Sequence, residues 1–166
     1  MKGFRDAWNT RSSLEPTVRG DARTYLSSSE RDYYLIIRIE EILPHIREVY
    51  EFLRVREELS TLPEDFLHLN VKTFGPRKPD TEIIRKVLSD QESFVAEFGN
   101  LNLFPEALIL ECRSTEIRSI NRRLSENFGA PPVDKDSFLP HVTLAYFRTA
   151  DIGDLTDYLQ VRRQLN

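Results

Sequence analysis

The sequence contains two similar stretches, which read FLHLNVKTFG at residues 66–75 and FLPHVTLAYF at residues 138–147. Apolar and polar residues alternate around the histidine of each stretch, and this period of two is typical of a β-strand with one buried face. The histidines are His68 and His141, each near the start of its strand. The sequence therefore predicts two similar strands, each presenting a histidine on one face.

The segments around these two strands show the patterns of further strands and amphipathic helices. Strands are expected at residues 33–39, 93–98 and 107–112, and helices at residues 44–60, 81–90, 115–128 and 151–163. The strand at 33–39 is rich in β-branched and aromatic residues, which predicts that it is largely buried. Gly99-Asn100 is expected to form a turn or a bulge.

The order of these elements predicts an α+β, mixed α/β, fold. Each histidine strand follows an amphipathic helix, so the chain reads as two structurally related strand-helix-strand lobes that share one cleft. We expect residues 31–166 to form this single bilobal domain. Residues 1–30 show no clear periodicity and are expected to be an N-terminal arm or an irregular lead-in.

Length, composition and charge exclude several classes of protein. The chain has 166 residues and a net charge of −4, which argues against a protein that coats duplex DNA through bulk positive charge. One cysteine, Cys112, cannot form an internal disulfide or a Cys-rich zinc site. The sequence has no run of about 18 apolar residues and no secretory signal pattern, so we expect a cytoplasmic protein without a membrane partner, taken as a monomer.

The residues on the histidine faces suggest phosphate chemistry. Two imidazoles of near-neutral pKa suit paired acid–base catalysis, in which one accepts a proton from water and the other donates a proton to a leaving oxygen. Asn70 and Thr143, two residues after each histidine, can donate hydrogen bonds to phosphate oxygens. Lys72 is expected on the same face as His68, where it would add a positive charge. No carboxylate lies in either motif, so this chemistry requires no metal and no cofactor.

The two stretches resemble the paired His-x-Thr/Ser-hydrophobic motifs of the 2H phosphoesterase superfamily. The most similar branch is the family of 2′-5′ RNA ligases and RNA 2′,3′-cyclic phosphodiesterases, and the resemblance covers roughly residues 31–160. It implies a bilobal fold around a metal-free cleft. It also implies hydrolysis of a 2′,3′-cyclic phosphate, at an RNA 3′ end or on a small cyclic nucleotide, to a 2′-phosphomonoester, or reversible 2′-5′ joining of RNA ends.

The resemblance also implies roles for individual residues. His68 would protonate the departing 3′ oxygen, His141 would activate water, and Asn70 and Thr143 would hold the phosphate. Asn70 departs from the Thr or Ser of the family, and Tyr146 stands where several ligase-like members carry Arg. We therefore treat Lys72 and Tyr146 as further candidate substrate contacts.

Two other interpretations remain open at this stage. The same fold could be a non-catalytic module that binds nucleotides or RNA ends, which the departures at Asn70 and Tyr146 would suit. The chain could also be a generic α+β protein with two incidental histidines. His45 lies outside the paired motifs and is expected at the surface, without the spacing of a zinc ligand.

Overall fold

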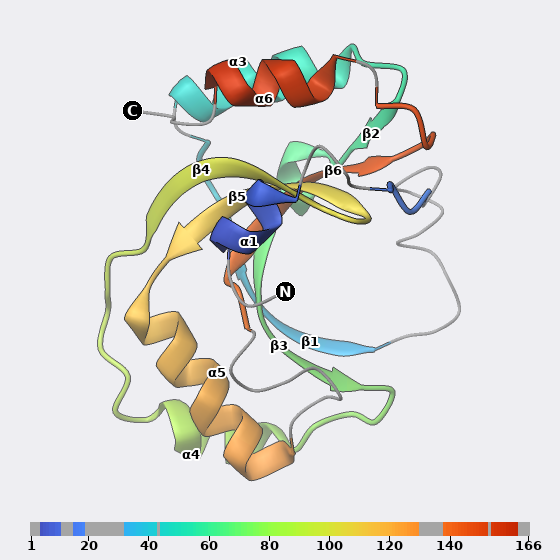
Figure 1. Cartoon of the computed structure of the whole chain (residues 1–166). Coiled ribbons are helices and arrows are strands. Elements are labelled where there is room, and N and C mark those ends of the chain that lie inside the picture. Colours follow the sequence, from blue (N-terminus) through green and yellow to red (C-terminus); the bar gives the residue numbers. More distant parts are fainter. Residues whose placement is uncertain are drawn as a thin grey trace.

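The computed structural model describes residues 4–10, 15–18, 32–42, 44–129, 138–152 and 154–162. These residues form a six-stranded sheet in the order β1-β3-β6-β5-β4, with β2 also paired to β6 (Figure 1). Every strand pair is antiparallel. The strands are β1 (Tyr33–Arg38), β2 (Leu59–Thr61), β3 (His68–Gly75), β4 (Glu97–Phe104), β5 (Ala107–Arg113) and β6 (His141–Phe147).

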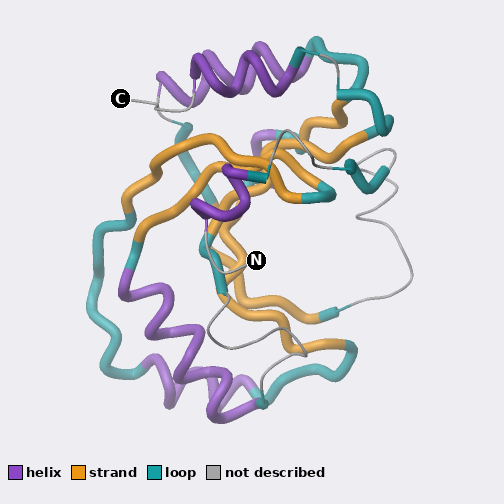
Figure 2. Tube along the Cα trace, viewed as in Figure 1, coloured by secondary structure: helices purple, strands orange, loops and turns teal. Residues whose placement is uncertain are grey.

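Two pairs of helices lie at opposite ends of this curved sheet (Figures 1 and 2). At one end α3 and α6 lie side by side, and the rings of Phe52 and Tyr158 stack between them at 3.8 Å. At the other end α4 and α5 pack together, and α5 also packs on β3. The longer helices are α3 (Pro44–Arg54), α4 (Thr81–Leu88), α5 (Thr115–Phe128) and α6 (Leu155–Arg162), and a short 3₁₀ turn, η2, spans Glu64–Phe66.

The helix α5 shows how local sequence sets the boundaries of an element. Ser114 accepts a hydrogen bond from the backbone N–H of Ile117 and so caps the first turn. Gly129 follows the last turn with a φ of 77°, a conformation that glycine adopts without strain. Ile117, Ile120 and Leu124 are buried along one face of the helix. The predicted helix at 115–128 and the predicted α+β class are therefore confirmed.

The structure corrects three sequence-based expectations about strands. The helix expected to reach residue 60 ends at Arg54, because Leu59–Thr61 pair with β6 as β2. The strand expected at 93–98 begins at Glu97, and Gly99-Asn100 form the expected bulge inside it. The strand β1 is largely exposed instead of buried, since it lies at the edge of the sheet and pairs with β3 alone.

The N-terminal segment also differs from the expected irregular lead-in. Phe4–Asn9 form a helix, α1, which packs against β4. Ala7 and Trp8 of this helix are buried, with 1% and 8% of their surface exposed. Of the expected lead-in, residues 1–3, 11–14 and 19–30 lie outside the described residues.

Candidate active site

The two histidine strands, β3 and β6, are direct neighbours in the sheet. Leu69 of β3 pairs with Val142 of β6 in an antiparallel register. Because the strands are antiparallel, the residues on either side of this pair also lie opposite one another: His68 is across from Thr143, and Asn70 is across from His141. Residues directly opposite one another share a face of the sheet, so the four predicted site residues meet on one surface. All four are half-buried, whereas Leu69 and Val142 between them are buried.

A backbone carbonyl sets the tautomer of each histidine. The Nδ1 atom of His68 lies 2.6 Å from the carbonyl oxygen of Phe66, and Nδ1 of His141 lies 2.6 Å from that of Leu139. Because a carbonyl oxygen only accepts, Nδ1 carries the proton in both rings. The other nitrogen, Nε2, is then unprotonated in the neutral ring and can accept a proton. The two histidines thus have the same local geometry, each bonded to the residue two positions before it.

The surroundings of His141 favour its neutral form. Burial lowers the pKa of this imidazole below its ordinary value of 6.5, and a positive charge on nearby His68 lowers it further. The Leu139 carbonyl and the Glu106 carboxylate oppose this lowering of the pKa. The ring also meets Phe104 edge-on, with centroids 4.9 Å apart. His141 is therefore suited to accept a proton near neutral pH, as a general base does.

The lowered pKa of His141 makes a prediction about pH dependence. A base must be neutral to act, so the acidic limb of the kcat/KM profile for a 2′,3′-cyclic nucleotide should have its midpoint below pH 6.5. The ring proton signals of His141, followed by NMR and assigned by their loss in His141→Gln, should titrate with the same midpoint. A midpoint at or above pH 6.5 would contradict the assigned environment.

Asn70 brings an unsatisfied polar atom to the site. Its Nδ2 donates a long hydrogen bond of 3.4 Å to Oγ1 of Thr73, and its Oδ1 is buried without a partner among the described residues. A buried polar atom without a partner costs about 1–3 kcal/mol. Rotation of the amide would exchange the oxygen and the NH₂ group, which can donate to a phosphate oxygen. The unpaired position next to His141 is thus one that an anionic ligand could satisfy.

A bulge in β3 moves Lys72 away from the histidine face. The adjacent β1 residues Leu35 and Ile36 pair with Lys72 and Asn70, so Val71 is an extra residue in β3. Such a bulge changes the face on which the following residues lie. Lys72 is 2% exposed and Val71 before it is 1% exposed. The sequence-based expectation that Lys72 shares the face of His68 fails because of this bulge.

The buried ammonium of Lys72 has a structural partner instead. Its Nζ donates a hydrogen bond of 3.1 Å to the carbonyl of Gly129, directly after α5. A cation at this position is favourable, because the C-terminal end of a helix carries partial negative charge. Lys72 therefore joins β3 to the end of α5.

A substitution separates these two roles of Lys72. Lys72→Ala should lower Tm by several degrees, since a buried side chain and its hydrogen bond together contribute about 2–3 kcal/mol and each kcal/mol shifts Tm by about 2–4 °C. It should leave kcat/KM for a nucleoside 2′,3′-cyclic phosphate unchanged at 20 °C. Lys78→Ala, at an exposed lysine, is the matched control and should change neither. A lowered kcat/KM at unchanged Tm would show that Lys72 contacts the substrate, as the sequence analysis expected.

A second bulge, in β6, brings Tyr146 onto the histidine face. Thr143 and Ala145 pair with consecutive residues of β5, so Leu144 is an extra residue in β6. Leu144 and Ala145 are both buried. Tyr146, the next residue, is half-buried and lies on the same face of β6 as Thr143. Strict alternation would place Tyr146 on the opposite face. The bulge thus supports Tyr146 as a candidate substrate contact, beside the position of Thr143.

The same arrangement identifies Thr73, which sequence reasoning missed. The first six residues of β3 and of β6 have the same order of buried and half-buried positions, and Thr73 occupies the place that Tyr146 has in β6. The hydrogen bond from Asn70 to Thr73 agrees with this position. The sequence did contain a signal, because a polar residue follows each histidine at the second and again at the fifth position.

The edge strand β1 adds a row of side chains that sequence reasoning assigned to the core. Arg38 pairs with His68, Ile36 with Asn70, and Tyr34 with Thr73, so these side chains continue the histidine face. Tyr34 is 51% exposed and Ile36 is 40% exposed. The guanidinium of Arg38 donates to the carbonyl of Asp65 at 3.0 Å.

Two features bear on metals and membranes. Within the described ranges, no group of three or more His, Cys, Asp or Glu is arranged to hold a metal ion. No helix in the part of the chain that the structure describes is long and apolar enough to cross a membrane.

Comparison with known proteins agrees with this geometry. A family model described as the 2′-5′ RNA ligase superfamily matches residues 40–165, which include both histidine strands. The chain belongs to this superfamily. The sequence-based resemblance is thereby confirmed, and the paired histidine strands of this 2′-5′ RNA ligase superfamily member are its candidate active site. No curated protein matches the sequence.

Two crystal structures share the fold of this superfamily member at low sequence identity. TT0787 of Thermus thermophilus is 18% identical, with a TM-score of 0.51, and the match covers 72% of this chain and 75% of that one. ATU0111 of Agrobacterium tumefaciens, titled a conserved protein of unknown function, is 17% identical, also with a TM-score of 0.51. That match covers 80% of this chain and 69% of the other.

Proposed function

We propose that this superfamily member hydrolyses a 2′,3′-cyclic phosphate, at an RNA 3′ end or on a small nucleotide, to a 2′-phosphomonoester. The observation that carries the proposal is the pair of histidines on adjacent strands, each with Nδ1 bonded to a carbonyl and Nε2 left for proton exchange. Two such groups beside Asn70 and Thr143 suit a phosphate held between an acid and a base.

The proposed reaction follows from the tautomers and the lowered pKa of His141. Nε2 of neutral His141 accepts a proton from water as the water oxygen bonds to phosphorus. The bond from phosphorus to the 3′ oxygen breaks, and Nε2–H of protonated His68 donates its proton to that oxygen. The products are a 2′-phosphate and a free 3′ hydroxyl. The same steps, with an RNA 5′ hydroxyl in place of water, would give 2′-5′ joining.

Turnover of the four nucleoside 2′,3′-cyclic phosphates tests this proposal. The assay contains EDTA, and the position of the product phosphate is determined by NMR. We expect a 2′-phosphate from the wild-type protein, formed equally well with and without EDTA. A 3′-phosphate product, or activity that EDTA abolishes, would overturn the proposed mechanism.

A non-catalytic module that binds nucleotides or RNA ends is the second candidate, and one observation favours it. Asn70 replaces the smaller hydroxyl side chain that the resemblance leads us to expect, and its amide lacks a partner for Oδ1 among the described residues. The binding module predicts that a nucleotide binds without turnover.

Asn70→Thr distinguishes the two candidates. If the cleft is catalytic with Asn70, the substitution should change kcat by less than about tenfold, since one hydrogen bond replaces another. A gain of several hundredfold from a barely active wild type would show that the cleft has lost catalysis and favour the binding module. Thr143→Ser, which keeps a hydroxyl at the equivalent place in β6, serves as the matched control.

A further inference from the structure

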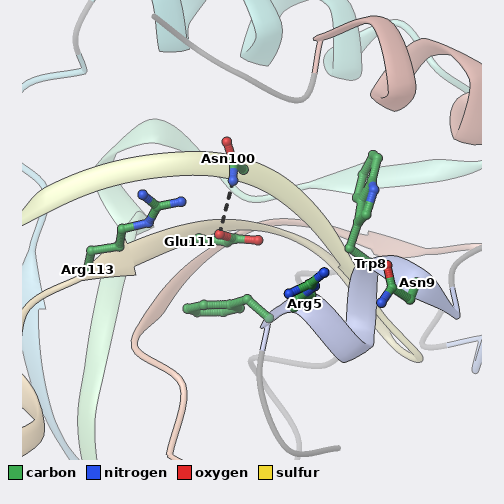
Figure 3. Close-up of a pocket in the computed structure, with 7 residues that line it drawn as sticks. Arg5, Trp8, Asn9, Asn100, Glu111 and Arg113 are labelled. Atoms are coloured by element: carbon green, nitrogen blue, oxygen red, sulfur yellow. Dashed lines mark hydrogen bonds between the residues drawn. The ribbon is translucent and has the colours of Figure 1, made fainter.

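A polar pocket lies beside the histidine face, between α1 and the strands β4 and β5 (Figure 3). Its volume is about 440 Å³, within the range of about 300–1,000 Å³ that is usual for small-molecule sites. Arg5 and Trp8 of α1 form one side, and Asn100, Glu111 and Arg113 form the other.

The helix α1 is held firmly enough to form a wall. Nδ2 of Asn102, a buried residue of β4, donates to the carbonyl of Phe4 at 2.8 Å. The Phe4 ring stacks on Phe104 with centroids 6.5 Å apart, and Trp8 is 8% exposed. Because α1 precedes residues 40–165, it lies outside the part of the chain that matches the superfamily. The α1 wall of the pocket therefore lies outside the matched residues, and the pocket was not predicted from the sequence.

The pocket adjoins the proposed reaction centre. Glu111 of β5 pairs directly with His141 of β6, and Phe104 contacts both the His141 ring and Phe4. Neighbouring strands are about 4.8 Å apart, so the pocket walls on β5 and β4 are about 5–10 Å from the strand of His141. A group that occupies this pocket can belong to the same nucleotide whose phosphate lies at the histidines.

The charges around the pocket favour an anion at its mouth. Glu111 is 2% exposed at the base, where it accepts hydrogen bonds from Asn102 at 2.8 Å and from Asn100 at 3.4 Å. Arg5 and Arg113 are exposed on either side of it (Figure 3). Neither guanidinium has a hydrogen-bond or ion-pair partner among the described residues. Two exposed cations and one buried carboxylate line the pocket, and the exposed Glu97 of β4, which pairs directly with Arg113, lies outside this lining.

The guanidinium of Arg113 lies over the glycine of the β4 bulge. A Cβ added at Gly99 would lie 3.5 Å from Nε of Arg113 and 3.8 Å from its Cζ, so the guanidinium rests against the bare backbone of the β4 bulge. Planar guanidinium groups bind phosphate oxygens in pairs of parallel hydrogen bonds. These distances from the Gly99 position are ordinary van der Waals contacts, so Arg113 packs on the β4 bulge at the edge of the pocket.

We propose that this pocket binds the 5′-phosphoryl group of the nucleotide that carries the 2′,3′-cyclic phosphate, through Arg5 and Arg113. The ribose then bridges the histidine face and the pocket. The inference rests on the proposed function for the place of the cyclic phosphate. It specifies the substrate class as an RNA 3′ end, or a 5′-phosphorylated nucleotide, in preference to a nucleoside 2′,3′-cyclic phosphate.

Kinetics with three matched substrates test the inference. They are uridine 2′,3′-cyclic phosphate, the same nucleotide with a terminal 5′-phosphate, and the dinucleotide UpU ending in a 2′,3′-cyclic phosphate. A charge-assisted hydrogen bond contributes about tenfold, so we expect kcat/KM to be at least about tenfold higher for the second and third substrates. If only the dinucleotide is preferred, the pocket binds an internucleotide phosphate. If only the nucleotide with a terminal 5′-phosphate is preferred, the pocket binds a terminal phosphate.

Substitution of the arginines tests their part in this preference. Arg5→Gln and Arg113→Gln should each reduce the ratio of kcat/KM between phosphorylated and unphosphorylated substrates severalfold, and added salt should reduce it further. Arg122→Gln, an exposed residue of α5, makes the same change of charge and should leave the ratio intact. Equal kcat/KM for all three substrates, or arginine variants with an unchanged ratio, would overturn the inference.

A binding measurement separates this inference from the proposed function. Trp8 lines the pocket and is the single tryptophan of the chain, so its fluorescence reports directly on occupancy. In a His68→Ala, His141→Ala double variant, the 5′-phosphorylated nucleotide should change Trp8 emission at lower concentration than the unphosphorylated one. If the phosphorylated nucleotide changes Trp8 emission in this way but the wild-type protein shows no turnover, the pocket proposal stands and the proposed catalytic function is rejected. Turnover by the wild-type protein without any Trp8 response would retain catalysis and reject the pocket.

Discussion

Replacing His141 by alanine is expected to lower kcat for a 2′,3′-cyclic nucleotide by about 10²–10⁴-fold, the usual contribution of a general acid or base. His68→Ala should lose a similar factor, because the proposed reaction needs one group to take a proton and another to give one. Both residues are half-buried on a continuous sheet surface, so truncation should leave the fold intact.

Stability measurements and two further variants make this result specific. Initial rates are followed at pH 7 with saturating substrate, and the melting temperature of each variant is compared with that of the wild type. His45→Ala, the third histidine of the chain, is the matched control and should keep full activity. The double variant should be about as slow as either single variant, since the two groups act as a unit. A His141→Ala protein with wild-type kcat would remove the basis of the proposed mechanism.

Replacing Leu69 by alanine is expected to destabilise the fold by about 3 kcal/mol, within the 2–5 kcal/mol usual for such core substitutions. Leu69 is 1% exposed and lies between His68 and Asn70, at the pair with Val142 that joins β3 to β6. The loss combines the transfer of the leucine side chain to water with the cavity left behind. It should lower Tm by about 6–12 °C.

Thermal and urea unfolding of Leu69→Ala measure this effect. Val95→Ala, at a side chain that is 82% exposed, is the matched control and should change stability by less than about 0.5 kcal/mol. The m-value should stay the same if the substitution acts on the native packing. A Leu69→Ala protein as stable as the wild type would mean that the β3–β6 junction is not part of the cooperative core.

Local patterns in the sequence were sufficient for the elements whose signals are short-range. The helix at Thr115–Phe128 was predicted with its terminal glycine, because hydrogen bonds and periodicity within a few residues determine its extent. Alternation around His68 and His141 likewise predicted both strands and the shared face of the histidines with Asn70 and Thr143.

Elements that depend on distant partners were missed or misplaced. Leu59–Thr61 continue a helical pattern in sequence, yet they form β2 because β6 offers a free edge there. β1 looks like a core strand by composition but lies at the sheet edge, where the order of strands leaves it exposed. The polar N-terminal segment has little periodicity, and helix α1 is stabilised by burial of Trp8 on β4.

The sequence by itself was sufficient to indicate the superfamily. It also predicted that His68 shares a face with Asn70 and His141 with Thr143, because spacing along a strand sets which side chains share a face. Only the tertiary structure decided the positions of Lys72 and Tyr146. A bulge in each strand reverses the alternation, and bulges arise from pairing with neighbouring strands that are remote in sequence. The structure likewise set α1 on β4, since nothing local in residues 4–9 indicates which part of the sheet the helix covers.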